Sequence, residues 1–179
     1  FIGDYKGAID RLRPVSETTN ENFVLNNVRL GSAALVEYDL DDAESAFLRA
    51  YEVMNSVGVN DGGRSLGAVL VDEKIKIWKG EPFERAMANF YLGLVYYMRH
   101  DYGNARGAFE NALFKLRDAN PEKAKDQGHD VESNFSLATL MLAKSYQRLG
   151  REDLAKASFQ YVIDHHPQLA ALADYDWNE

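Results

Sequence analysis

Small and apolar residues recur along the chain at helical spacing, in stretches separated by short polar turns. In three places a small residue that follows leucine is itself followed twelve positions later by alanine and four further on by phenylalanine. Apolar positions three or four residues apart share one face of an α-helix, so each set predicts two helices joined by a turn. The three sets are Gly31, Ala43 and Phe47; Gly93, Ala105 and Phe109; and Ala143, Ala155 and Phe159.

This spacing resembles the tetratricopeptide repeat (TPR), a helix-turn-helix unit of about 34 residues. The resemblance implies an all-α fold, a right-handed α-solenoid in which small residues let paired helices approach and phenylalanine fills the gap to the next pair. We predict one TPR-like domain over residues 1–179, with two inserts between repeats. Its parts are a half repeat 1–16, a repeat 21–57, an insert 58–81, a repeat 82–119, an insert 120–130, a repeat 131–167 and a C-terminal cap 168–179.

Capping residues predict where the helices begin and end. Asp39 or Asp41 is expected to cap the second helix of the first repeat, and Asp101 that of the next repeat. Gly150 is expected to end the first helix of the third repeat. The predicted helix ranges are 21–37, 41–56, 82–100, 102–117, 131–149 and 151–165.

The first residues match the second half of a repeat. Gly3-Asp4-Tyr5 corresponds to the turn between two helices of a repeat. Ala8 has the position of the recurring alanine, and Leu12 that of the phenylalanine. We therefore expect a helix that Pro14 ends soon after it starts, with its partner helix before residue 1. A short capping helix that has no partner is the alternative.

The repeats are unevenly spaced, which predicts the two inserts. Gly31 and Gly93 are 62 residues apart, and Gly93 and Ala143 are 50 apart. The first insert ends with the alternating segment 74–79, which predicts a short extended stretch, and inserts in solenoids often lie on the binding face. A connection that packs over the groove is the alternative. The second insert, around 123–130, is charged and is expected to extend a helix into a solvated loop.

The stretch Trp78-Lys79-Gly80-Glu81-Pro82 precedes a tyrosine-rich helix and the turn Asp101-Tyr102-Gly103. This part of the chain is similar to a family of uncharacterised bacterial envelope lipoproteins with TPR-like helices. The resemblance covers roughly residues 3–115. It implies a protein of the periplasm or anchored to the outer membrane by an acylated cysteine before Phe1. A cytoplasmic location is the alternative.

The exposed sides of the first helices predict a groove for a protein or peptide partner. Phe90, Leu94 and Tyr97 are apolar, whereas Lys144 and Arg148 are basic, and Trp78 from the insert is a candidate gate. Such a gradient suits an amphipathic helix or an extended peptide with an acidic end. TPR domains that grip a terminal carboxylate use Lys and Asn where this chain has Phe90 and Leu94, so that specificity is not expected. An apolar stripe of this kind is more often part of the core. The alternative is therefore that the insert or a neighbouring repeat covers these side chains.

Charge and cysteine content narrow the class of protein. A formal net charge of −8 and the lack of a basic tract argue against nucleic-acid binding. The chain contains no cysteine, which excludes disulfides, thiolate nucleophiles and cysteine-ligated zinc, and no run of residues is apolar enough to span a membrane.

Catalytic motifs are weak, so we predict a non-enzymatic scaffold without a metal or cofactor. His100, His129 and His165-His166 lack the spacing of a zinc helix, and Gly62–Gly67 lacks the Lys-Ser/Thr pair of a phosphate loop. The alternative function is a structural subunit packed permanently in a larger complex or homo-oligomer. An enzyme or small-molecule binder would need an enclosed polar pocket.

Overall fold

The computed structural model describes residues 3–55, 77–78, 80–117 and 135–171. Within these residues every regular element is helical. The elements are α1 (Tyr5–Ser16), α2 (Phe23–Val36), α3 (Leu40–Asn55), α4 (Pro82–Met98), α5 (Tyr102–Arg117), α7 (Ser136–Arg148), α8 (Glu152–His165) and the 3-10 helix η1 (Pro167–Leu169).

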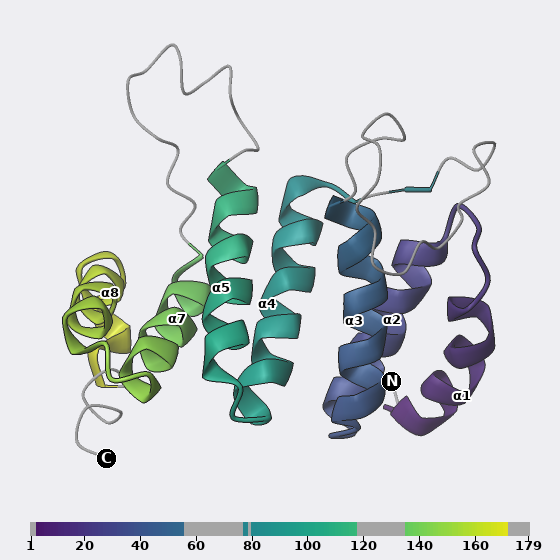
Figure 1. Cartoon of the computed structure of the whole chain (residues 1–179), viewed down its shortest axis with the longest axis horizontal. Helices are drawn as coiled ribbons and strands as arrows, with labels where there is room; N and C mark the ends of the chain where they lie inside the picture. The colour runs from purple at the N-terminus through teal and green to yellow at the C-terminus, as the bar shows by residue number, and fades with distance from the viewer. Residues whose placement is uncertain (1–2, 56–76, 79, 118–134, 172–179) are drawn as a thin grey trace, which may run out of the picture. The chain divides into compact units, whose positions relative to one another are not determined.

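The chain divides into two compact units, residues 1–81 and 82–179, which we describe separately. In the first unit α2 packs against both α1 and α3; in the second, α4 packs on α5, α5 on α7, and α7 on α8. Each pair α2–α3, α4–α5 and α7–α8 is joined by a three-residue turn (Figure 1). The predicted all-α fold, an α-solenoid of helical repeats, is confirmed.

One kind of turn joins the two helices of every repeat. After α2, Tyr38 adopts a positive φ of 63°, its N–H donates to the Leu35 carbonyl, and the Asp39 N–H donates to the Ala34 carbonyl. This pair of hydrogen bonds is the Schellman motif, which satisfies carbonyls left unpaired at a helix end. His100 (φ 62°) and Gly150 (φ 69°) occupy the same position after α4 and α7, with the corresponding two bonds.

Aspartates cap the second helices of the first two repeats, as the sequence predicts. The Asp39 carboxylate accepts from the Asp42 N–H at 3.2 Å, and the Asp101 carboxylate accepts from the Asn104 N–H at 3.1 Å. The Asp4 carboxylate accepts from the Gly7 N–H at 2.9 Å at the start of α1. A side-chain oxygen at this position satisfies one of the free N–H groups of the first turn.

Small residues set the distance between paired helices. A Cβ atom built on Gly31 would lie 2.9 Å from the Phe47 ring, and one built on Gly93 would lie 2.6 Å from the Phe109 ring. Contacts this short are closer than carbon atoms allow, so the phenylalanine ring packs where the glycine lacks a side chain. In the third repeat, Ala143 fills this position and is fully buried.

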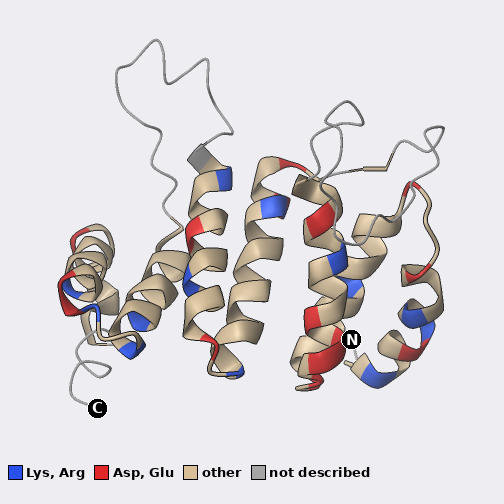
Figure 2. Ribbon diagram, viewed as in Figure 1, with Lys and Arg blue, Asp and Glu red and all other residues tan. Residues whose placement is uncertain are grey.

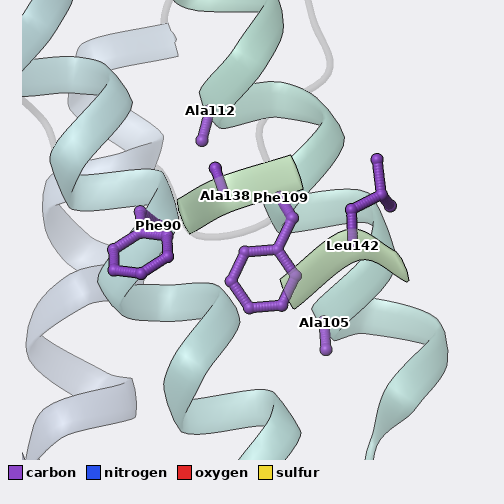
Figure 3. Close-up of a cluster of buried hydrophobic side chains, with 6 residues drawn as sticks. All are labelled: Phe90, Ala105, Phe109, Ala112, Ala138 and Leu142. Carbon is purple, nitrogen blue, oxygen red and sulfur yellow. The ribbon is translucent and has the colours of Figure 1, made fainter. Parts of the chain in front are cut away.

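The core of the second unit forms around Phe109. Figure 3 shows the ring of Phe109 among side chains from α4, α5 and α7, with Phe90 at one side and Leu142 at the other. A second cluster joins α7 to α8 through Leu140, Phe159 and Val162. Burying a phenylalanine in this way stabilises a unit by about 3–5 kcal/mol relative to alanine.

Several predicted helix ends differ from the structure. Helix α1 does not end at Pro14 but continues to Ser16. A proline lacks the N–H that would bond to the carbonyl four residues earlier, but its fixed φ is compatible with a helix, so the chain can continue for a few residues beyond it. The first helix of the second repeat ends at Met98 rather than His100, and α7 begins at Ser136 rather than Val131.

Other predictions concern residues that the structure does not describe. They include most of the first insert with its alternating segment, the second insert, residues 131–134, His129 and the end of the C-terminal cap. The described part of that cap is η1, which packs against α8.

Candidate functional site

The predicted groove residues of the second unit lie on α4 and α7, which contact each other. Phe90 belongs to the core: it is 3% exposed, and its ring centroid lies 5.0 Å from that of Phe135 and 5.7 Å from that of Phe109. Phe135, which precedes α7, covers the face of α4 on which Phe90 lies. The Phe90 side chain therefore lies in the core beneath the predicted surface and is not exposed on it.

Leu94 and Tyr97 lie further along α4 and are half-buried. Both pack against the Phe109 cluster, and the Tyr97 ring meets the Tyr102 ring edge-on at 5.2 Å. After Arg85, α4 carries no charged residue up to its end at Met98, and its ribbon is tan over that stretch (Figure 2). Leu94 and Tyr97 are the part of the predicted apolar surface that solvent reaches.

The basic end of the predicted surface lies on α7. Lys144 is half-buried and Arg148 is exposed, and they are one turn apart near the carboxyl end of the helix (Figure 2). Cations at this end of a helix also complement its dipole. The second unit therefore holds four of the six predicted residues at least partly accessible to solvent, two apolar ones on α4 and two basic ones on α7, a helix that contacts α4.

Trp78 belongs to the first unit. Its backbone N–H donates to the Glu21 carbonyl at 3.3 Å, just before α2, and its side chain is 40% exposed. In the first unit, Val28 and Ser32 of α2 occupy the positions that Phe90 and Leu94 have in α4. Both are half-buried, and Ser32 donates its hydroxyl proton to the Val28 carbonyl. The predicted role of Trp78 as a gate stays a prediction.

A polar cluster between α5 and α7 was not predicted from the sequence. The Tyr146 hydroxyl donates to Glu110 at 2.7 Å, and Arg106 donates to both carboxylate oxygens of Glu110 at 2.8 and 2.9 Å. Burial raises the pKa of Tyr146 above its usual value, and the hydrogen bond to Glu110 raises it further. The four-residue spacing of Arg106 and Glu110 was a signal for their ion pair, but nothing in the sequence signalled the tyrosine.

Two buried asparagines were also missed. Asn27 and Asn89 each lie four residues before the glycine of their repeat and are 0% and 1% exposed. Asn27 donates to the Ser16 and Phe23 carbonyls and accepts from Arg49, whereas Asn89 donates to the Arg85 carbonyl. The repeat spacing could have identified this shared position, because both asparagines fall at the same distance from the small residue.

The described residues contain no group of three or more His, Asp or Glu side chains placed to hold a metal ion. His100 follows α4 and is in contact with the Tyr102 hydroxyl at 2.7 Å, and His165 ends α8. None of the helices within the described ranges has the length and apolar character needed to cross a membrane.

Comparison with known proteins supports the repeat. A family model described as tetratricopeptide repeat matches residues 137–168, which comprise nearly all of α7, α8 and the start of η1. A search of the curated proteins finds no match to the chain. The match to the third repeat, the shared turns and the all-helical fold together support a TPR-like protein.

Proposed function

We propose that this chain is a non-enzymatic protein-binding module and that its second unit holds a peptide or helix with an apolar side and an acidic end. TPR-like repeats generally bind protein partners through the surface formed by successive first helices. The observation that carries the proposal is that α4, with half-buried Leu94 and Tyr97, contacts α7, which carries the basic residues Lys144 and Arg148.

The chemistry of the partner follows from this arrangement. Leu94 and Tyr97 offer half-buried apolar area on a core that already fixes their positions, so little conformational entropy is lost when a partner packs on them. Lys144 and Arg148 add attraction for carboxylates that weakens as salt increases. Phe90 belongs to the core cluster against which Leu94 and Tyr97 pack, so it acts as a positioning residue for these two side chains.

Selection from a library of displayed random peptides tests the proposal. We expect enriched peptides to pair an aliphatic or aromatic residue with Asp or Glu. The double variant Lys144→Glu with Arg148→Glu should bind them at least about tenfold more weakly, equal to roughly 1.4 kcal/mol. Arg151→Glu, which reverses an exposed charge in the turn before α8, is the matched control and should bind normally.

Two results would contradict the proposal. One is that no peptide is enriched; the other is that acidic peptides bind the double variant and the parent chain equally. Light scattering on the same samples separates the alternative of a structural subunit, because a permanent homo-oligomer would have a multiple of the chain's mass.

We further propose the bacterial cell envelope as the location. This rests on the similarity of the stretch Trp78–Tyr102 to TPR-like envelope lipoproteins. Metabolic labelling of the native protein with a tagged fatty acid, followed by membrane fractionation, tests it. Recovery of unlabelled protein in the cytoplasmic fraction would contradict the proposal.

A further inference from the structure

Helix α1 repeats the pattern of the second helices of the three complete repeats. From its capping residue Asp4, the alanine slot is four residues on at Ala8, the phenylalanine slot at Leu12 and the last apolar slot at Val15. The corresponding residues are Ala43, Phe47 and Ala50 in α3; Ala105, Phe109 and Ala112 in α5; and Ala155, Phe159 and Val162 in α8.

In the complete repeats these three slots are buried without exception. All nine residues are between 0% and 5% exposed. The short distances from Phe47 to Gly31 and from Phe109 to Gly93 show that the first helix of the same repeat covers these slots, and in the second repeat α7 covers them from another side. The slots therefore mark the face on which a second helix receives its partner.

In α1 the same face is uncovered. Val15 is 42% exposed, and Ala8 and Leu12 are only half-buried. Helix α1 also packs against α2 (Figure 1), but in α1 it is Ile9 and Ser16 that are buried, and the Ser16 carbonyl accepts from the Asn27 side chain of α2. Like α5, which packs on α7, α1 packs on the first helix of the repeat that follows it.

The backbone before α1 gives independent support. Gly3 has φ 65° and is followed by the capping Asp4. The same order occurs at Tyr38, His100 and Gly150. Each has a positive φ and is followed by the residue that directly precedes a second helix. At those three positions the residue with positive φ lies two places after the end of a first helix.

We propose that the Ala8–Leu12–Val15 face of α1 binds a helix of the first-helix type, formed by the residues of the protein directly before Gly3. The register places a glycine or alanine of that helix opposite Leu12, twelve residues before Ala8. The resulting pair is a fourth repeat, in which Gly3 has the role of Tyr38, His100 and Gly150. The inference is independent of the proposed peptide-binding surface, which lies in the second unit.

A graft tests this proposal on the chain itself. Residues 82–99, which form the first helix of the second repeat up to its turn, are attached directly before Gly3 in place of residues 1–2. Covering the exposed face should raise the thermal unfolding temperature of the first unit by roughly 4–8 °C. It should also slow amide exchange in α1 at least tenfold.

Two substitutions distinguish docking on this face from nonspecific stabilisation. Val15→Asn should abolish the gain from the graft, because it places an amide in the contact. Asp10→Asn should leave the gain intact, because Asp10 is exposed, and so are its counterparts Ser45 and Ala157. No gain from the graft, or a gain that survives Val15→Asn, would overturn the proposal. A proline or a bulky residue twelve positions before Ala8 in the coding sequence would do the same.

Discussion

The first and second complete repeats bury an asparagine at the same position but satisfy it differently. In the first, Asn27 donates to Ser16 of α1 and to Phe23, and its carbonyl accepts from Arg49 of α3 at 2.7 Å. In the second, Asn89 donates to the Arg85 carbonyl, and its own side-chain oxygen has no hydrogen-bond partner among the residues that the structure describes. A buried amide stabilises a helix pair only when its polar atoms are paired.

The difference follows from the residues at one position of the second helices. Arg49 lies two residues after Phe47, and the residue two after Phe109 is Asn111. An arginine is long enough to reach the asparagine of the facing helix, and Asn111 is much shorter. The apolar contacts of the two repeats are therefore alike, but their polar contacts are not.

Shortening the central phenylalanine tests whether the apolar contacts are equivalent. Phe47→Ala and Phe109→Ala should each destabilise their own unit by about 3–5 kcal/mol, because both rings are at most 1% exposed. Urea unfolding measures the loss, and hydrogen exchange assigns it to a unit. A large loss for one variant and almost none for the other would show that the two contacts are not equivalent.

Replacing the asparagines separates the two repeats. Asn27→Leu should cost about 2–3 kcal/mol, because it removes two donated bonds and leaves Arg49 without its acceptor. Asn89→Leu should change the free energy of unfolding by less than about 1 kcal/mol, since it also removes an unpaired oxygen. Chemical denaturation of both variants measures this difference, and equal losses would contradict it.

Adding a methyl group to each glycine examines the helix separation. Gly93→Ala should cost about 1–3 kcal/mol through crowding with Phe109, more than the gain of about 1 kcal/mol in helix propensity. Gly31→Ala should cost less, because its nearest ring atom is 2.9 Å away rather than 2.6 Å. Ala143→Gly, in the repeat that already has the methyl group, should lose about 1 kcal/mol. Stabilisation by Gly93→Ala in thermal unfolding would rule out crowding there.

Tyr146 should give the smallest effect and one that depends on pH. The raised pKa means that folding favours the protonated phenol, so its contribution is present below a pH of about 10 and is lost as the pH rises through the folded-state value. Tyr146→Phe should lose about 1 kcal/mol at neutral pH. The difference from the parent chain should shrink in alkaline solution, and a difference that stays constant from pH 8 to 11.5 would contradict this.

Local signals in the sequence predicted most of the helices. Asp39, Asp101 and Gly150 mark helix ends because each acts through its own residue and the adjacent turn. The burial of Phe90 could not be predicted in the same way, because its neighbour Phe135 is distant in the chain and precedes another helix pair. The apolar stripe on α4 looks the same in the sequence whether its residues are covered or exposed.

The pairing of Tyr146 with Glu110 was hidden for a similar reason. These residues are 36 positions apart and belong to different helix pairs. A contact between helix pairs depends on the angle at which they meet, which the spacing does not specify. Leu94, Tyr97, Lys144 and Arg148 stay a predicted surface that only binding measurements can test.

The turns at Tyr38, His100 and Gly150 also have a consequence for the speed of folding. Each closes with hydrogen bonds between residues three and five positions apart, and the helices it joins are neighbours in the chain. Short loops of this kind close within about 100 ns, and topologies rich in local contacts fold fastest. We therefore expect each helix pair to be able to start folding as soon as its own residues leave the ribosome, before the rest of the chain has been synthesised.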